Sequence, residues 1–413
     1  MNNKTNVQFD PYDEDVFKAG AKAFADFGRQ HPIDHYQGRF DFYISSDYDD
    51  VKKNILVNND TWLYSKGTGP KPLAEGLANT GIMSDPPIHN GIRMVIQRGF
   101  SPKELKRLSK EVDDLSAELI KKMQAMPEKK GNFFELYAMP LAARLMCRML
   151  GVPEKDYLVY KKWADQFMYK LFNDQQEGVE AEDAFQMAQE FMGIIAERRQ
   201  ILADAGVEPS LEHVGTLIPN DFISRYICDK VDGRYLNEWE IISMLSGIIN
   251  GGNETTMNLI CNLLWRLLET PELWEQLKAS PELVPAAVEE SLRFDPPVIG
   301  MMRVAAKDTQ LQGVDIAKDA RVFYNIAAVN RNEQIWPEAD KFSLDRPEAD
   351  SRKHASFSGG SHLCLGIGLA RMEVKQVFEQ LIVELPNLRL LAAPTRAPGF
   401  NFNGQINLPV AWD

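Results

Sequence analysis

The sequence predicts a mainly α-helical fold with a smaller β region, built as one domain over residues 1–413. Helical periodicity dominates, because apolar residues recur at spacings of three and four through several long segments. Alternating strand patterns are few and short. The chain contains no internal repeat, no low-complexity tract and no Ser/Gly linker that would separate modules.

The expected helices follow one another along the chain. Residues 100–123 open on a Ser-Pro start signal, 184–206 end at a glycine, and 237–270 are long and apolar enough to cross the centre of a domain. Residues 280–294 carry a serine cap with glutamate at the third helical position, and 366–385 directly follow a cysteine. Strands are expected at 39–45, within 309–330 and in the closing residues, and residues 1–10 are expected to be poorly ordered.

Composition excludes several classes of protein. The formal net charge of −13 argues against a broad nucleic-acid surface, although a local basic patch for an acidic partner protein remains possible. No stretch of about 18 consecutive apolar residues occurs, so no membrane span is expected. The polar, acidic N-terminus does not resemble a signal peptide. The four cysteines are far apart, which favours reduced thiols and a cytoplasmic protein.

One cysteine stands out from the other three. Cys364 lies in "FSGGSHLCLGIG", among glycines and directly before a predicted helix. Backbone N–H groups at a helix start stabilise a thiolate, and glycines let a bulky group approach the backbone. These features indicate metal or cofactor ligation, or nucleophilic catalysis. Cys147, Cys228 and Cys261 have helical, apolar contexts typical of inert core cysteines.

A second unusual stretch, "GGNETT", interrupts the long apolar helix at residues 251–256. Each glycine costs a helix interior roughly 1 kcal/mol relative to alanine, and a buried Glu254 needs a partner or water. A polar surface patch would explain the residues without any function. The functional interpretation is a local opening of the helix over a cofactor, with Glu254 and Thr255 as an adjacent acid and alcohol.

Two charged pairs complete the pattern. Glu290 and Arg293 share a helix face in "EESLR", and His89 and Arg93 share one in "DPPIHNGIR". Such pairs are usually exposed ion pairs of little energetic value. The spacing F-x-x-G-x-x-x-C-x-G, taken together with the three other segments in this order, resembles the cytochrome P-450 family of haem-thiolate monooxygenases over nearly the whole chain.

The resemblance implies a role for each matching residue. It implies a triangular-prism-like domain that holds haem b between the long central helix and the cysteine loop, with Cys364 as the axial ligand of the iron. The loop positions are Phe357, Gly360 and Gly366, and Ser358 departs from the glycine usual in soluble bacterial members. The propionate-binding positions are His89, Arg93, Arg303 and His362. Glu254 and Thr255 correspond to the proton-relay pair, while Glu290, Arg293 and Arg346 correspond to a structural triad.

The substrate pocket is predicted only in outline. By resemblance it includes Met244, Ile248, Gly251, Val298, Ile299, Met301, Phe400 and Phe402, with Phe167, Leu171 and Phe172 as a roof, and each apolar member could equally be core. The set predicts an apolar organic substrate, such as a terpenoid, aromatic or steroid-like compound. Tyr64, Lys66 and Thr68 are weaker candidates for anchoring a polar group.

Several functions fit these residues. A monooxygenase would insert one atom of dioxygen into the substrate, and the intact Glu254–Thr255 pair favours it over a peroxygenase driven by hydrogen peroxide. A non-catalytic haem sensor or electron carrier is the alternative from another class, and a cysteine hydrolase fits least. Electrons are expected from a separate iron–sulfur ferredoxin and its flavoprotein reductase, docking near Arg98, Lys353 and Arg371. We expect a monomer with no nucleic-acid or membrane partner.

Overall fold

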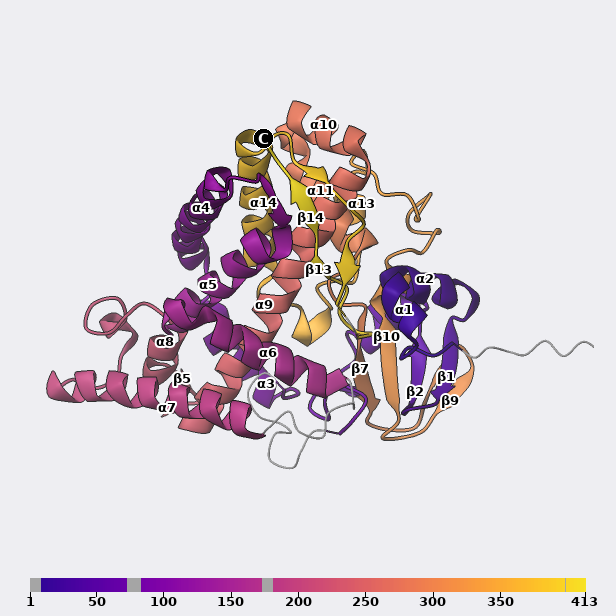
Figure 1. Cartoon of the computed structure of the whole chain (residues 1–413). Helices are drawn as coiled ribbons and strands as arrows, with labels where there is room; N and C mark the ends of the chain where they lie inside the picture. The colour runs from indigo at the N-terminus through magenta and orange to yellow at the C-terminus, as the bar shows by residue number, and fades with distance from the viewer. Residues whose placement is uncertain (1–8, 73–82, 173–180, 398) are drawn as a thin grey trace, which may run out of the picture.

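The computed structural model describes residues 9–72, 83–172, 181–397 and 399–413, while the side chains of residues 167–184 lie outside the description. The mainly α-helical fold with a smaller β region is confirmed. Figure 1 shows a large helical body with the main β-sheet at one side, and α9 running through the middle. The expectation of poor order over residues 1–10 falls almost wholly outside the described residues.

The helices carry most of the chain. The α-helices are α1 (Glu14–Ala19), α2 (Ala21–Gln30), α3 (Ile88–Arg98), α4 (Pro102–Ala125), α5 (Met139–Leu150), α6 (Tyr157–Phe172), α7 (Ala181–Asp204), α8 (Phe222–Cys228), α9 (Glu238–Glu269), α10 (Pro271–Ala279), α11 (Val284–Phe294), α12 (Ile326–Val329), α13 (Glu348–Ser351) and α14 (Ile367–Glu384). Short π-helical or 3₁₀ turns are η1 (Asp50–Ile55), η2 (Phe134–Ala138), η3 (Glu154–Asp156), η4 (Leu211–His213), η5 (Pro281–Leu283) and η6 (Gly360–His362).

The central helix α9 starts and stops where its sequence dictates. The Asn237 side chain accepts from the Glu240 N–H, and the Glu240 side chain accepts from the Asn237 N–H, which forms a complete capping box. Beyond Glu269, Pro271 starts α10. Helices α5, α6, α11 and α14 pack around α9. It is therefore buried along most of its length, as its nearly continuous apolar sequence predicts.

One expected helix differs from its prediction. Residues 280–294 divide into the 3₁₀ turn η5 and the helix α11, and Ser280 makes no side-chain capping bond. Pro285 lies in the first turn of α11, where its missing N–H costs nothing. The proline therefore sets the helix start more strongly than the serine does.

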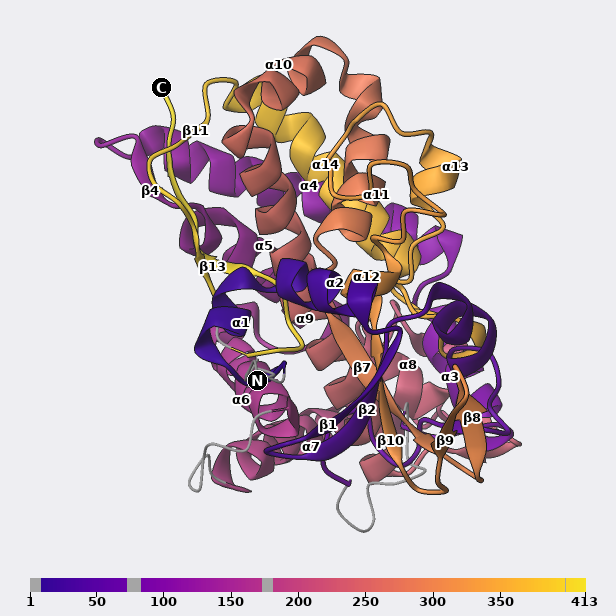
Figure 2. The ribbon, with the colours of Figure 1, turned by 90° about the vertical axis from the view of Figure 1, so that its right-hand side faces the viewer.

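The strands form a main sheet and several small ones. They are β1 (Ile33–Gln37), β2 (Asp41–Ser45), β3 (Trp62–Leu63), β4 (Lys130–Asn132), β5 (Lys230–Val231), β6 (Arg234–Tyr235), β7 (Gly300–Ala305), β8 (Thr309–Leu311), β9 (Val314–Ile316), β10 (Arg321–Asn325), β11 (Arg389–Leu390), β12 (Thr395–Arg396), β13 (Gln405–Asn407) and β14 (Pro409–Ala411). The main sheet has the order β1-β2-β10-β7-β3, and only the β2–β10 pair is parallel. Figure 2 shows this sheet beside α2 and α12.

The core follows this division. One large cluster of buried apolar side chains fills the helical body, and two smaller clusters lie on the sheet side. Within the described ranges, no helix combines the length and apolar character that crossing a bilayer requires.

Candidate haem-thiolate site

The cysteine loop has a backbone that few residues can adopt. Gly360 has a φ of 60°, and a Cβ there would lie 2.3 Å from the Leu56 carbonyl oxygen. Ser358, which departs from the family pattern, has a φ of 61°, in the left-handed region that glycine tolerates best. The Cys364 N–H donates to the Phe357 carbonyl at 2.9 Å. The loop therefore folds back on itself and presents Cys364 just before α14.

The thiol of Cys364 has an electrostatic environment that the other cysteines lack. Burial raises its pKa, while the N–H groups of Gly366 and Ile367 and the guanidinium groups of Arg93 and Arg371 lower it. Burial also raises the pKa values of the remaining three thiols, and no cation of the described residues lowers them. Cys364 is thus the cysteine equipped to carry a negative charge.

A compact cluster of rings and cations lies beside this loop. The ring centroids of His89 and His362 are 4.1 Å apart, and Tyr64 stacks on His362 at 4.1 Å. The Arg303 guanidinium lies 4.5 Å from the centroid of the Tyr64 ring. These residues come from α3, the cysteine loop, β7 and the segment after β3, so the fold gathers them from distant parts of the chain.

The cluster has donors without acceptors. His89 Nδ1, Arg303 Nη2 and His362 Nε2 are buried and have no hydrogen-bond partner among the described residues. Asp85 is the nearby carboxylate, 3.8 Å from His362 Nε2, and it already accepts from the N–H groups of Tyr64 and Ser65 at 2.8 and 3.0 Å. Burial opposes its ionisation, yet His362 and these donors lower its pKa to about 2.

Unpaired buried donors are costly, so the cluster fits an anionic ligand. The two carboxylates of haem would satisfy these nitrogens, and the neighbouring thiol could bind the iron. The residues present therefore fit the group. Arg93 Nη2 donates to the Leu363 carbonyl at 2.8 Å. It thereby ties α3 to the residue next to Cys364.

The two glycines of the central helix have separate surroundings. A Cβ on Gly251 would meet no atom within 4 Å, whereas a Cβ on Gly252 would lie 2.3 Å from Met146 Cε on α5. The expected opening of the helix is wrong, because α9 continues without interruption through both residues. Thr255 Oγ donates to the Gly251 carbonyl at 2.6 Å. Gly251 keeps one helix face open, and Gly252 permits close helix packing.

Glu254 belongs to a charged group that the sequence did not indicate. Its Oε2 lies 3.5 Å from Lys161 Nζ on α6, and Lys161 also pairs with Asp165. Burial raises the pKa of Glu254, Lys161 lowers it, and Asp165 raises it. The Asp165 side chain is 45% exposed, whereas that of Glu254 is 16% exposed. A chain of titratable groups therefore runs from Glu254 to the surface.

Glu290, Arg293 and Arg346 meet in the interior. Arg293 donates to both Glu290 oxygens at 2.7 Å, and Arg346 Nε donates at 3.2 Å. Arg293 also donates to the carbonyls of Asn330 and Ala339. These bonds hold the segment before the cysteine loop against α11, as a structural triad would.

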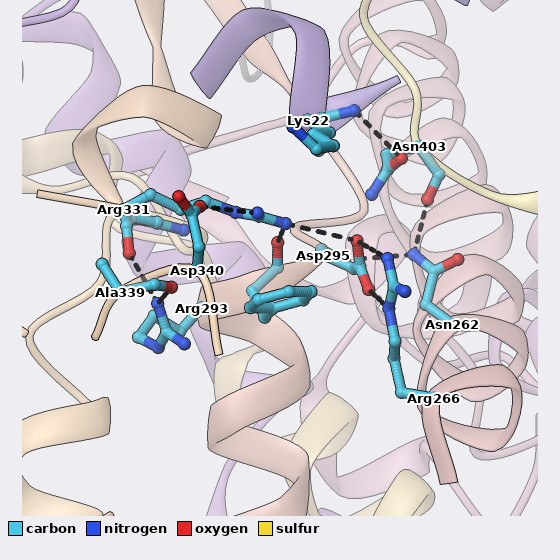
Figure 3. A network of polar contacts seen from close by, with 12 residues as sticks. Lys22, Asn262, Arg266, Arg293, Asp295, Arg331, Ala339, Asp340 and Asn403 are labelled. Carbon is cyan, nitrogen blue, oxygen red and sulfur yellow. Dashed lines mark hydrogen bonds and ion pairs between the residues drawn. The ribbon is translucent and has the colours of Figure 1, made fainter. Parts of the chain in front are cut away.

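The same region holds the C-terminal segment in place. Figure 3 shows Asn262 of α9 donating to the Asn403 carbonyl, with Arg266 paired to Asp295 beside it. The Asn262–Asn403 bond is 2.6 Å, and Arg266 Nε lies 2.6 Å from Asp295. The central helix thus anchors both the turn before β7 and the segment that carries Phe402.

The predicted pocket residues fall into two groups. Val298 and Phe402 form a β-bridge and are half-buried, Gly251 borders open space, and Met301 is half-buried on β7. Four others are buried in core clusters: Met244 and Ile248 in the helical body, Ile299 and Phe400 on the sheet side. Ile299 and Phe400 pack among Phe24, Phe42 and Phe323.

The residues predicted as the pocket roof and as polar anchors have other surroundings or lie outside the description. The side chains of Phe167, Leu171 and Phe172 lie outside the described residues. Tyr64 belongs to the ring-and-cation cluster, and Thr68 is buried with its carbonyl bonded to the Met302 N–H. The carbonyl of Lys66 accepts from Arg321. This segment is therefore fixed by the sheet.

Comparisons with known proteins agree with this geometry. The family model for cytochrome P450 matches residues 83–386. A Bacillus subtilis protein named as cytochrome P450 YjiB is 32% identical over 84% of this chain and 82% of its own length. The mycinamicin IV hydroxylase/epoxidase of Micromonospora griseorubida is 30% identical over 80% of each chain.

A solved structure shows the same fold. Cytochrome P450 CREJ, in complex with (4-ethylphenyl) dihydrogen phosphate, superposes with a TM-score of 0.84 over 98% of this chain and 99% of its own, at 24% identity. Within the described residues, the helices, the sheet and the cysteine loop all belong to that architecture. The chain is a member of the cytochrome P450 family of monooxygenases.

Proposed function

We propose that this cytochrome P450 binds haem b through Cys364 and hydroxylates an apolar organic compound with dioxygen. One oxygen atom enters the substrate, and the other leaves as water after two electrons and two protons are consumed. The observation that carries the proposal is the position of the Cys364 thiol beside a buried cluster in which His89 Nδ1, Arg303 Nη2 and His362 Nε2 have no hydrogen-bond partner among the described residues. Haem with a thiolate ligand supplies the chemistry that cleaves the O–O bond.

The residues of the chain have distinct proposed roles. His89, Arg303 and His362 bind the haem carboxylates, and Arg93 fixes the loop through the Leu363 carbonyl. Glu254 exchanges protons with solvent through Lys161 and Asp165, and Thr255 passes them on from the face of α9 that is open at Gly251. This route to solvent supports a monooxygenase over a peroxygenase, because hydrogen peroxide already carries the protons that dioxygen needs.

The residues proposed to contact the substrate are less polar than those proposed to bind the haem carboxylates. Val298, Phe402 and Met301 are apolar and half-buried, close to the segments that α9 anchors. They support an apolar substrate, such as a terpenoid, aromatic or steroid-like compound. All four cysteines are free, which supports a reducing cytoplasm.

The test is spectroscopic. Purified ferric protein titrated with apolar compounds should change from low to high spin when a substrate displaces water from the iron. Cys364→Ala should abolish the red-shifted ferrous–CO band that a thiolate ligand produces, while His213→Ala, in the turn η4 and outside the loop, should leave it intact. Persistence of that band in Cys364→Ala would overturn the proposal.

A further inference from the structure

Two adjacent glutamates of α11 hold different parts of the chain. Glu290 holds Arg293 and Arg346, whereas Glu289 faces the cysteine loop. Arg371 of α14 donates to Glu289 through Nε at 2.5 Å and Nη2 at 2.9 Å, which is the two-bond geometry of a strong ion pair. His354 Nε2 lies 3.3 Å from the same carboxylate.

These two partners flank the cysteine loop in the chain. His354 precedes Phe357, and Arg371 follows Cys364 on α14. A single buried carboxylate therefore bonds both ends of the segment that contains the thiol. His354 Nδ1 also accepts from the Ser356 N–H at 3.2 Å, so the imidazole is held on both sides.

Arg371 also contacts the middle of the cysteine loop. The Arg371 guanidinium lies 5.0 Å from the centroid of the Phe357 ring, and the Phe357 carbonyl accepts the Cys364 N–H. The guanidinium therefore packs against the residue that bonds the backbone of Cys364, and Glu289 determines both its position and how far its charge is neutralised.

The Glu289 carboxylate is buried, so its charge needs partners in the folded protein. The Glu289 and His354 side chains are each 2% exposed, and that of Arg371 is 27% exposed. Burial opposes ionisation of Glu289, yet His354 and Arg371 lower its pKa to about 2. Removing either charge leaves the other buried and uncompensated.

We propose that Glu289 is a positioning residue for the Cys364 thiolate, which bonds Arg371 and His354 at the two ends of the loop and sets the electric field at the sulfur. The inference rests on the proposed function, since it requires Cys364 to bind haem iron. It predicts that the pair Glu289–Arg371 controls the reduction potential without touching the cofactor.

The test uses the direction in which each variant shifts the reduction potential. Glu289→Gln leaves the Arg371 cation unbalanced, which should favour the reduced state and raise the equilibrium constant for reduction about fivefold. Arg371→Gln leaves the Glu289 anion and should lower it by a similar factor. The double variant should return close to the wild-type value. Titrations run well above the ordinary histidine pKa of about 6.5 keep His354 neutral.

Glu379→Gln is the matched control, because Glu379 is a partly exposed carboxylate on α14, the helix that carries Arg371, and it pairs with Lys375. It should leave the potential unchanged. Single variants that shift the potential in the same direction, or no further than this control, would overturn the inference and leave only a structural clamp. If Glu289→Gln does not fold, Arg371→Gln and the double variant still decide the sign.

The wild-type spectrum separates the two proposals. A wild-type protein without the thiolate-type ferrous–CO band overturns the proposed function, and this inference with it. A normal wild-type band with unmoved potentials in the variants overturns this inference alone.

Discussion

Buried Glu373 makes the stability of the protein depend on pH. It lies on α14, 2% exposed, with Oε1 unpaired among the described residues, and burial raises its pKa from 4.5 to about 8. Between these pH values the folded protein holds a proton that the unfolded chain releases, so stability is greatest at the acidic end and falls as pH rises through 8.

Replacing Glu373 tests this dependence. Glu373→Gln should remove the slope, and above the folded pKa the variant should be more stable than wild type by about 5 kcal/mol, since each unit of pKa shift corresponds to about 1.4 kcal/mol. Urea unfolding followed across this pH range measures the difference. Parallel stability curves for the two proteins would contradict it. Glu384→Gln, at the exposed end of the same helix, should track wild type throughout.

At the residue level, the sequence indicated candidate site residues but not the residues that contact them. Cys364, Glu254, His89 and Arg303 could be found because each lies in a short motif with a fixed spacing. Lys161, Asp85 and Tyr64 could not, because their roles depend on contacts between distant segments. A single Lys161–Asp165 pair on a helix is indistinguishable in sequence from a surface ion pair.

At the element level, the central helix shows why two glycines were misread as one feature. Both lower helix propensity, which predicted an opening, but tertiary packing keeps α9 continuous. The same limit applies to Ile299 and Phe400. An apolar residue near a pocket can face either the pocket or the core, and the sequence does not distinguish the two orientations. Helix positions were predictable because their periodicity is local.

The different surroundings of Gly251 and Gly252 can be tested separately. Gly251→Ala adds a methyl group in open space and should stabilise the protein by about 1 kcal/mol through helix propensity. Gly252→Ala places a methyl group 2.3 Å from the terminal Cε of Met146, so this flexible side chain must move aside, which should offset part of that gain. Denaturant unfolding of the two variants measures this. Equal stability changes would show that Gly252 has no packing role.

At the scale of the whole molecule, the surface charge needs a new interpretation. Each residue of the expected basic patch is neutralised: Arg98 pairs with Asp229, Lys353 with Asp350, and Arg371 with Glu289. That could not be read from the sequence, because two of these acids are distant in the chain. The residue before Cys364, Leu363, is 39% exposed, and Met94 on α3 is 60% exposed. An electron donor can therefore approach the thiol at this face.

Two exposed lysines at the start of α4 have no ion-pair partner among the described residues. Leu105 of α4 lies 3.1 Å from the position that a Cβ on Gly368 would occupy, which brings the start of α4 next to the cysteine loop. Lys103 lies two residues before Leu105 and Lys106 directly after it, and both are exposed and form no ion pair within the part of the chain that the structure describes. On a protein with net charge −13, we expect a local positive site of this kind to attract an acidic electron-transfer partner.

Reversing both charges tests this docking site. Lys103→Glu with Lys106→Glu should slow reduction by a small acidic iron–sulfur ferredoxin about tenfold at low ionic strength, because steering of the encounter is lost. The difference should shrink as salt shortens the Debye length to about 3 Å near 1 M. Lys307→Glu, exposed after β7, is the control for net charge, and it should leave the rate near wild type. Equal slowing by the control would show that overall charge, and not a local site on α4, governs the encounter.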